Sequence, residues 1–262
     1  MSRSTDLYTR RAESYAIGRP EYPPDALMPL TAIVGVAPPA EIADIGSGTG
    51  ILTGSLLGLG YHVYAVEPNE AMRLVADRVH LGHRGYRSVA AAAEHTGLPD
   101  QSVDAITVGQ SLHWFDLAQV RVEFARILRP GGGLLALWNE MRCRNCAFCQ
   151  ALEGVLISLL PAYAAARAQA PDPVELVTAA MPPGTSIHPS HLRHEQHVTE
   201  EGLWHRIHST SYAPERGDPL AEQLRHALAV LFREHAADGL VTLHYTATVI
   251  TAVPPGSKGV RP

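Results

Sequence analysis

The chain has 262 residues, 46% of them hydrophobic and 18% charged, which is typical of an ordinary globular protein. A net charge of −5 without a polybasic run argues against nucleic acid as a partner, and three cysteines are too few for a disulfide framework. No apolar run reaches the roughly 18 residues of a membrane span or resembles a secretory signal, so we expect a cytoplasmic protein with reduced thiols.

The first 140 residues predict strands that alternate with helices. Strands are expected at 41–45, 62–66, 86–90, 103–108 and 134–138. Helices are expected over 25–35, over 50–60, after Pro68 and Asn69, and after Asp116, a residue that can cap a helix. This alternation predicts an α/β fold with a doubly wound, mostly parallel sheet, whose strands end at one ligand-binding edge.

Beyond residue 140 the periodicity is weaker. A helix is expected over about 145–165, an Ala- and Pro-rich loop or mobile lid over 166–190, and a strand over 191–198. Helices at about 200–209 and 218–236 and a strand at 241–252 follow. We therefore expect one Rossmann-like domain over 1–253 with about seven strands. It would have a cofactor-binding core over about 25–140, a helical cap and C-terminal strands over about 141–253, and a disordered tail over 254–262.

The segment EIADIGSGTG, residues 41–50, places Gly46, Gly48 and Gly50 directly after a predicted buried strand. A phosphate-binding P-loop needs a lysine after its last glycine, and none follows here. The dinucleotide fingerprint needs a further glycine at the position of Ile51. The motif therefore fits neither type of phosphate site. It leaves open a glycine turn that serves only the change of direction from strand to helix.

An acid, Glu67, follows the second predicted strand. A carboxylate there can accept hydrogen bonds from both ribose hydroxyls of an adenosine, and it would repel a 2′-phosphate. The glycines would allow the backbone to lie against the amino-acid part of a ligand. The setting of the glycine turn therefore favours a nucleoside ligand over a turn without a ligand.

The chain resembles the class I S-adenosylmethionine-dependent methyltransferases. The resemblance is carried by EIADIGSGTG, by VYAVEPNEAM (63–72), by GLPDQSVDAITVGQSLHWFD (97–116) and by ILRPGGGLLALWN (127–139). It is strong over residues 8 to about 140 and weak over the rest. The His-Trp-Phe sequence and the N-terminal YAIGRPEYP (15–23) are similar to the small-molecule branch, methyltransferase type 11, with the trans-aconitate-methyltransferase-like proteins.

The resemblance implies a cofactor, S-adenosyl-L-methionine, and roles for matched residues. Asp44 would support the loop and the methionine amino group, and Glu67 would hold the ribose. Tyr15 and Arg19 would close over the cofactor's carboxylate, for which a guanidinium is well suited. The remaining implied cofactor contacts are Gly46, Gly48 and Gly50 at the methionine part, Pro68, Ala93 and Glu94 at the adenine, and Gln110 at the sulfonium. Ala92 departs from the family, which often has an acid or Ser there.

Methyl transfer from a sulfonium needs alignment first, and a base only when the acceptor is protonated. His113, just after the fourth strand, is the candidate base, or it packs beside the cofactor or orients the substrate. Trp114 and Phe115 could stack on a planar acceptor, wall the pocket or pack in the core. Trp138 and Asn139, which end the fifth strand, are expected in the pocket wall.

Two clusters resemble metal sites without completing one. Cys143, Cys146 and Cys149 are spaced by three, but no fourth ligand is close in sequence, and small apolar packing explains them as well. His188, His191, His194 and His197 lie where a loop leads into a strand, so they are expected to face solvent or substrate. We expect no metal.

The expected reaction is methyl transfer from S-adenosyl-L-methionine to a small molecule, with S-adenosyl-L-homocysteine as product. O-methylation is favoured, followed by C- or N-methylation. A cyclisation or rearrangement that uses the bound cofactor's charge, or a non-catalytic binding module, stays open. Neither nucleic acid nor a membrane is an expected partner, and both a monomer and a homodimer are compatible with the sequence.

Overall fold

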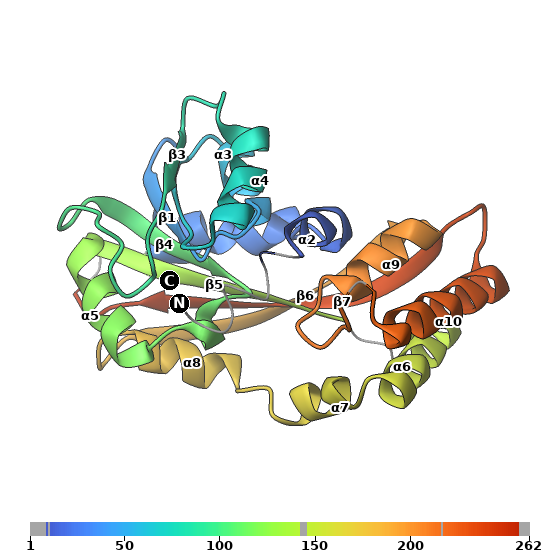
Figure 1. Cartoon of the computed structure of the whole chain (residues 1–262). Coiled ribbons are helices and arrows are strands. Elements are labelled where there is room, and N and C mark those ends of the chain that lie inside the picture. The colour runs from blue at the N-terminus through green and yellow to red at the C-terminus, as the bar shows by residue number, and fades with distance from the viewer. Residues whose placement is uncertain (1–8, 10, 142–145, 216, 257–262) are drawn as a thin grey trace.

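The computed structural model of the chain describes residues 9, 11–141, 146–215 and 217–256. They form a seven-stranded sheet with the order β3-β2-β1-β4-β5-β7-β6 (Figure 1). The strands are β1 (Glu41–Ile45), β2 (His62–Val66), β3 (Tyr86–Val89), β4 (Val103–Gly109), β5 (Leu128–Met141), β6 (Ser186–Val198) and β7 (Val241–Val253). Strands β1 to β5 are parallel, whereas β7 runs antiparallel to both β5 and β6. The predicted fold class, a mostly parallel Rossmann-like sheet, is confirmed.

Several of the helices begin at short polar side chains that cap them. They are α2 (Ala12–Gly18), α3 (Ile51–Gly58), α4 (Glu70–His80), α5 (Leu117–Ile127), α6 (Ala147–Leu159), α7 (Pro161–Ala168), α8 (Pro173–Ala180), α9 (Glu200–His208) and α10 (Pro219–His235), with short helices η1 (Pro24–Leu27), η2 (Leu30–Val34) and η3 (Leu112–Trp114). The Asp116 side chain caps α5, as predicted, and the Asn69 side chain caps α4.

Apolar side chains cover both faces of the sheet. On one face, Phe124 of α5 and Val177 of α8 belong to a cluster of buried residues that includes the sheet residue Ile106. On the other face, Leu30 of η2 and Leu56 of α3 pack with the neighbouring strand residues. Burial of both faces is what a parallel sheet requires, because its strands have no polar side to expose.

The long strands β6 and β7 pair over 13 residues and extend beyond the parallel strands (Figure 1). Helices α6, α9 and α10 pack on this extension around a second apolar cluster, which includes Phe148, Leu203, Leu224 and Tyr245. Helix α7 lies between α6 and α8 in the chain and in space (Figure 1). We call α6, α7, α9 and α10 the cap.

The predicted loop or lid over 166–190 is wrong. This stretch holds the end of α7, all of α8 and the start of β6. The Asp172 side chain accepts a hydrogen bond from Val174 N at 2.7 Å, and Pro173 occupies the first turn of α8. Val177 and Ala180 are then fully buried in the cluster that contains α5. Burial of this short apolar face explains a helix in a segment rich in Ala and Pro.

Two other predicted boundaries differ for backbone reasons. The predicted helix over 145–165 is two helices, α6 and α7, bent by 109° at the break before Pro161, which has no backbone N–H to continue the helix. Strand β5 already begins at Leu128, because a register shift between Val103 and Ala105 of β4 accommodates the residues around Gly131. Cys143 and residues 257–262 of the predicted tail lie outside the described residues.

Within the described part of the chain, no single helix is long and apolar enough to cross a membrane. The bent pair α6 and α7 passes that test only when its two helices are taken together. Several of its large apolar side chains, such as Phe148, Leu152 and Leu156, are buried in the second apolar cluster.

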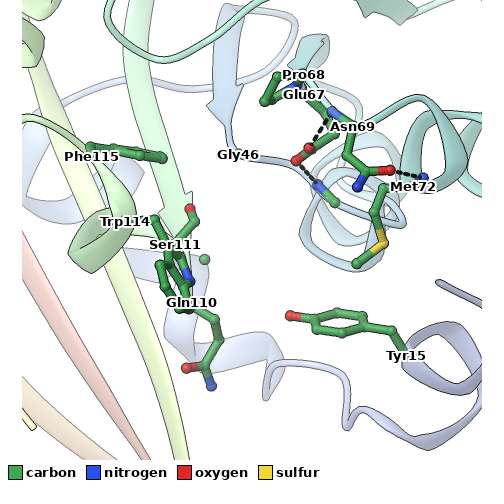
Figure 2. A pocket seen from close by; sticks show the side chains of 12 residues that line it. Tyr15, Gly46, Glu67, Pro68, Asn69, Met72, Gln110, Ser111, Trp114 and Phe115 are labelled. Carbon is green, nitrogen blue, oxygen red and sulfur yellow. Dashed lines mark hydrogen bonds between the residues drawn. The ribbon is translucent and has the colours of Figure 1, made fainter. Parts of the chain in front are cut away.

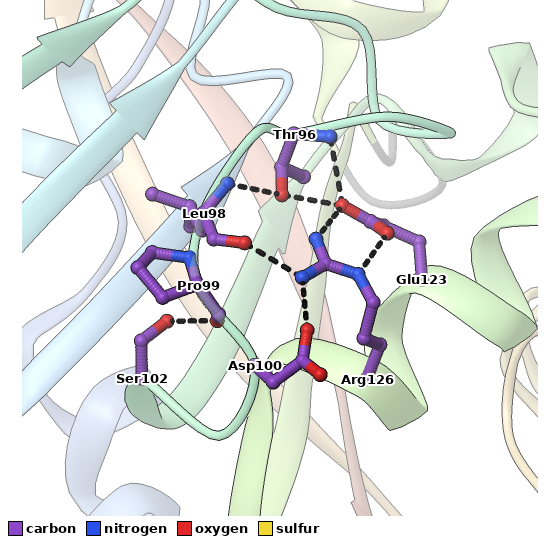
Figure 3. A network of polar contacts seen from close by, with 7 residues as sticks. All are labelled: Thr96, Leu98, Pro99, Asp100, Ser102, Glu123 and Arg126. Carbon is purple, nitrogen blue, oxygen red and sulfur yellow. Dashed lines mark hydrogen bonds and ion pairs between the residues drawn. The ribbon is translucent and has the colours of Figure 1, made fainter.

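A buried carboxylate ties the loop between β3 and β4 to α5 (Figure 3). Glu123 Oε1 accepts hydrogen bonds from Thr96 N at 2.8 Å and from the Thr96 hydroxyl at 2.5 Å. The Arg126 guanidinium donates to both Glu123 oxygens and to Asp100. Burial alone would raise the pKa of Glu123, but the hydrogen bonds from Arg126 and Thr96 outweigh it and lower that pKa to about 2.

We expect the Glu123→Gln substitution to lower the free energy of unfolding by about 3 kcal/mol at pH 7. Because the folded-state pKa is depressed, this stabilisation is present above the ordinary pKa of 4.5 and is lost as the pH falls toward 2. Urea denaturation at pH 7 and pH 3 measures it. The control is Asp100→Asn, an exposed partner of Arg126 whose loss should cost at most about 1 kcal/mol. Equal stability of the two variants at pH 7 would contradict the prediction.

Candidate functional site

The three glycines after β1 have different neighbours. All have positive φ values, +66° for Gly46, +58° for Gly48 and +84° for Gly50, so a side chain would strain each of them. A Cβ atom on Gly46 would lie 2.6 Å from Ser111 Oγ, and one on Gly50 would lie 2.9 Å from the His80 ring. A Cβ atom on Gly48 would meet no heavy atom within 4 Å. Gly48 is therefore the position where the turn faces open space.

Glu67, directly after β2, joins this turn to the start of α4 (Figure 2). Its Oε2 accepts a hydrogen bond from Gly48 N at 3.0 Å, and its Oε1 accepts one from Asn69 N at 2.8 Å. The residue is 9% exposed, and burial raises its pKa. Since an ionised carboxylate has about four acceptor positions, each oxygen keeps a lone pair for a ligand hydroxyl.

Asp44 lies beneath the turn near the end of β1 and is completely buried. Its carboxylate accepts hydrogen bonds from the hydroxyls of Thr53 at 2.6 Å and Thr107 at 3.0 Å. Burial, only partly offset by these hydrogen bonds, raises the pKa of Asp44 to about 6. A cation that approached this carboxylate would favour its ionised form.

Three adjoining clefts meet where β1 and β4 end, and Tyr15 and Gln110 line all of them. The β2-side cleft is lined by Tyr15, Gly46, Gly48, Glu67, Pro68, Asn69, Met72, Gly109, Gln110, Ser111, Trp114 and Phe115. The glycine-turn cleft is lined by Tyr15, Arg19, Pro20, Tyr22, Asp44, Gly46, Ser47, Gly48, Thr49, Ile51, Leu52, Gly109, Gln110 and Asn139. The cap cleft is lined by Tyr15, Arg19, Gln110, His113, Trp114, Asn139, Glu140, Met141, Tyr163, Ala166, Arg167, Ala170, Arg206, Thr210, Ser211 and Tyr212.

The N-terminal helix α2 brings the predicted pair Tyr15 and Arg19 to these clefts. The Arg19 guanidinium lies 4.7 Å from the centre of the Tyr15 ring, a cation–π distance. Arg19 Nε also donates to Ser209 Oγ, just after α9, at 3.1 Å. The helix therefore spans from the glycine turn to the cap, and Arg19, directly after it, lines both the glycine-turn cleft and the cap cleft.

Gln110 occupies the point where the sheet order reverses, directly after β4. Its φ is +61°, a left-handed conformation that is rare for a residue with a side chain and costs about 1 kcal/mol. The backbone N donates to Leu137 O and the side-chain Nε2 donates to Asn139 O, both at 2.9 Å. These bonds to β5 hold the strained residue where all three clefts meet.

The His-Trp-Phe segment divides between two clefts. His113 lines the cap cleft, Phe115 lines the β2-side cleft, and Trp114 lines both with 43% of its surface exposed. Partial desolvation lowers the pKa of His113, and the positive charge of Arg19 acts in the same direction. Its imidazole is therefore neutral at pH 7 and can accept a proton.

Four predicted site residues line none of the three clefts. Ala93 is buried in the core, and the Glu94 carboxylate accepts a hydrogen bond from Asp116 N at 2.9 Å. Gly50 packs against His80 behind the turn. Trp138, predicted in the pocket wall, instead packs in the core beside the sheet. Pro68 lines the β2-side cleft.

Asn139, beside Trp138, lines the glycine-turn and cap clefts. Its side-chain nitrogen donates to Glu21 O at 3.2 Å. Its Oδ1 lies 2.9 Å from His194 Nε2, so one of the four histidines on β6 contacts the wall of the site. Sequence spacing alone could not reveal this, because the contact depends on the pairing of β6 with β7 beside β5.

Sequence reasoning missed several lining residues. The Thr49 hydroxyl, inside the glycine motif, is buried in the glycine-turn cleft and has no hydrogen-bond partner among the described residues. Asn69 and Met72 from the start of α4 line the β2-side cleft. Asn69 carried a signal, since a cap residue two positions after Glu67 must lie near it. Thr49 and Met72 carried none that a single sequence shows.

The cysteine and histidine clusters form no metal site within the described ranges, where no group of three or more His, Cys, Asp or Glu side chains could hold an ion. Cys146 caps α6 through its sulfur, which accepts from Cys149 N at 3.5 Å, and Cys149 is buried. The four histidines lie along the continuous strand β6, not in a loop leading to it.

Comparisons with known proteins connect the site to a chemistry. Residues 43–136 match a family model described as a methyltransferase domain. An uncharacterized methyltransferase of Mycobacterium tuberculosis is 40% identical over 129 residues, 48% of this chain and 49% of the relative. A ubiquinone/menaquinone biosynthesis C-methyltransferase of Hahella chejuensis is 37% identical over 111 residues, 39% of this chain and 44% of the relative. The chain thus spans about half the length of the curated relatives it matches.

Solved structures share the fold. A protein from Anaeromyxobacter dehalogenans, solved as a candidate type II methyltransferase, has a TM-score of 0.59 and 24% identity, covering 89% of this chain and 97% of that chain. The phosphoethanolamine N-methyltransferase 2 of Haemonchus contortus, in complex with S-adenosyl-L-methionine, has a TM-score of 0.55 and 16% identity. That match covers 97% of this chain and 60% of the other.

The raised pKa of Asp44, the buried carboxylate beneath the turn, can be tested through the pH dependence of stability. Its raised pKa means that the folded chain holds this proton more tightly than the unfolded chain does. Between the ordinary value of 3.8 and about 6, the carboxyl therefore lowers wild-type stability as pH rises, by about 3 kcal/mol at most. Asp44→Asn cannot ionise, so the stability of the variant relative to wild type should rise by about 2 kcal/mol from pH 4.5 to pH 7.5. Urea denaturation of both proteins measures this, and a pH-independent difference would show that the pKa is not raised.

Proposed function

We propose that this chain, a member of the class I S-adenosylmethionine-dependent methyltransferases, transfers a methyl group from S-adenosyl-L-methionine to a small-molecule acceptor. One observation carries the proposal. The Glu67 carboxylate is held by Gly48 N and Asn69 N with acceptor positions left over, beside the one glycine of the turn that faces open space. This arrangement suits the two neighbouring hydroxyls of a ribose.

The β2-side cleft and the glycine-turn cleft together form what we call the cofactor-side clefts. Their other residues fit the parts of this cofactor. Asp44 and the unpartnered Thr49 hydroxyl offer acceptors for its ammonium group, and Arg19 offers a guanidinium for its carboxylate. Pro68, Met72 and Phe115 offer apolar contacts for its adenine. Bound there, the cofactor would supply a methyl group on a cationic sulfur, and S-adenosyl-L-homocysteine would be the product.

The protein's own part is to align the acceptor and to manage one proton. Gln110 and Tyr15 line the junction of all three clefts, so an acceptor in the cap cleft reaches the cofactor side there. His113 lines the cap cleft, and its neutral imidazole would accept the proton that a hydroxyl acceptor loses as its oxygen–methyl bond forms. We therefore favour O-methylation. C-methylation, the activity named for the Hahella relative, and N-methylation come next.

Two other functions would use the same cofactor site. A cyclisation or rearrangement would keep the cofactor as a fixed positive charge, and a binding module would hold it without reaction. The partly exposed His113 and Trp114, which line the cap cleft beside the junction, favour a catalytic role over a binding module. Cytoplasmic location, the absence of nucleic-acid and membrane partners, and a monomeric or homodimeric state remain predictions from the sequence.

Cofactor binding and turnover test the proposal together. We expect S-adenosyl-L-homocysteine to bind the purified chain in calorimetry and to be released from S-adenosyl-L-methionine when a suitable acceptor is added. Glu67→Gln, which keeps the side-chain shape but loses its charge, should bind S-adenosyl-L-homocysteine about 10- to 100-fold more weakly. Its control is Glu94→Gln, outside the clefts, with an expected change below threefold. Product without S-adenosyl-L-homocysteine would support cyclisation, and unchanged binding by Glu67→Gln would refute the proposed ribose contact.

His113→Ala tests the proton acceptor. We expect turnover to fall by about 100-fold, with S-adenosyl-L-homocysteine affinity nearly unchanged. Because the pKa of His113 is lowered, the wild-type rate should be flat around pH 7 to 8 and should fall only below pH 6.5, as the imidazole becomes protonated. The variant should lack this acidic limb, whereas the exposed His188→Ala should behave as wild type. A variant that turns over like wild type excludes the role of base.

A further inference from the structure

Arg206 in the last turn of α9 lines the cap cleft and is only 5% exposed. Its Nε donates to the Tyr245 hydroxyl at 2.8 Å. Its Nη1 is buried and has no hydrogen-bond partner among the described residues. Within the same residues, no ion pair joins this guanidinium to a carboxylate. A permanent positive charge is therefore buried beside the cleft with neutral partners only.

The groups around Arg206 offset only part of the free-energy cost of burying its charge. A guanidinium cannot give up its proton inside a protein, and burying an unpaired charge costs several kcal/mol. The Tyr245 ring, with its centre 5.6 Å from Arg206, contributes about 0.5–2 kcal/mol as a cation–π partner. The carbonyl end of α9 contributes about 0.3–1 kcal/mol. The balance favours an anion at this position.

The other charged side chains in the cap cleft already have roles. The Arg167 guanidinium forms an ion pair with Glu153 and donates to the Tyr163 hydroxyl. Among the described lining residues, Glu140 is the one carboxylate, and it already has an interaction of its own. Arg19 lines the cofactor side as well as the cap cleft, whereas Arg206 is among the lining residues of the cap cleft alone. The cofactor's carboxylate thus suits Arg19, and Arg206 is left for a second anion.

We propose that the acceptor carries an oxyanion, a carboxylate or a phosphate ester, which binds the Arg206 guanidinium in the cap cleft. This inference rests on the proposed function, whose acceptor site it specifies. A planar guanidinium binds both oxyanions through paired N–H groups. Aromatic side chains of Trp114, Tyr163 and Tyr212 line the same cleft and suit an apolar body between the oxyanion and the methylated atom. The oxyanion serves as the recognition group, and the reacting atom lies at the junction marked by Gln110 and Tyr15.

The guanidinium is held on a rigid support. A Cβ atom on Gly18 of α2 would lie 2.3 Å from Arg206 N, so the backbones of α2 and α9 are in direct contact. The Tyr245 hydroxyl that accepts from Arg206 donates in turn to Gln196 Oε1 at 3.0 Å. Helix α2 also carries Tyr15 and Arg19, so the sites for the cofactor and for the acceptor's anion share one packed interface. A site on such a support binds its ligand with little reorganisation.

Matched pairs of acid and neutral compounds test the proposal on the full chain saturated with S-adenosyl-L-homocysteine. The pairs are 4-hydroxybenzoate with 4-hydroxybenzamide and phenyl phosphate with phenol, and calorimetry measures their binding. We expect an acid of one pair to bind wild type at least about 10-fold more tightly than its neutral partner, the value of one charge-assisted hydrogen bond. The pair that shows this preference distinguishes a carboxylate from a phosphate acceptor.

Variants locate the effect. Arg206→Gln should lose the acid preference while its S-adenosyl-L-homocysteine affinity stays within about threefold, and Arg167→Gln, which removes an already paired guanidinium from the same cleft, should keep the preference. Thermal unfolding shows whether Arg206→Gln is folded. If it is not, Arg206→Lys takes its place as the test variant, and we expect it to bind the acid at least about threefold more weakly than wild type. The proposal is overturned by a wild type without acid preference in either pair, by a folded Arg206→Gln that keeps it, or by Arg206→Lys with unchanged acid affinity.

The two proposals fail in different ways. If wild type binds no S-adenosyl-L-homocysteine but prefers acids in a manner that depends on Arg206, the anion site stands and methyl transfer is wrong. If wild type binds S-adenosyl-L-homocysteine and methylates only the neutral members of the pairs, methyl transfer stands and the anion site is wrong.

Discussion

The Glu67 carboxylate accepts hydrogen bonds from Gly48 N and Asn69 N. These two bonds fix the loops that line the cofactor-side clefts. These bonds join three pieces of chain: the turn after β1, the end of β2 and the first residue before α4. A buried carboxylate needs such donors, because its charge is otherwise unfavourable away from water. By accepting two backbone N–H groups, Glu67 shapes both loops and still presents oxygens toward open space.

A second arrangement, the long pairing of β6 with β7, positions the cap and the cap cleft. The two strands extend past the parallel sheet and carry α6, α9 and α10 around their own apolar cluster. Helix α2 then packs backbone to backbone on α9, which brings Tyr15 and Arg19 between the cofactor-side clefts and the cap. Because the helices of the cap pack on strands of the same sheet, Arg206 and Asn139 both line the cap cleft although they lie far apart in the sequence.

Local sequence signals predicted the first half of the fold well. The limits of β1 and β2 agree with the pattern of buried residues between turns, and Asp116 caps a helix through its side chain as expected. The larger failures lie after residue 140. Pro161 breaks what reads as one apolar helix, and α8 forms in an Ala- and Pro-rich stretch because Val177 finds a buried position against the core. Such outcomes depend on partners that are distant in sequence, which periodicity cannot show.

The sequence by itself excluded both phosphate-binding motifs at the glycine turn and predicted a nucleoside ligand there. The evidence was the missing lysine, the missing third fingerprint glycine and the acid after the second strand. These residues are close together in the sequence, and over such short spacings the chain has little freedom to place them differently. Only the tertiary structure decided what each glycine does. Gly46 makes room for Ser111 and Gly50 for His80, and of the three only Gly48 has open space where a Cβ atom would lie. It likewise decided that Arg206 is buried without an anionic partner, because burial and pairing arise only when α2, α9 and β7 pack together.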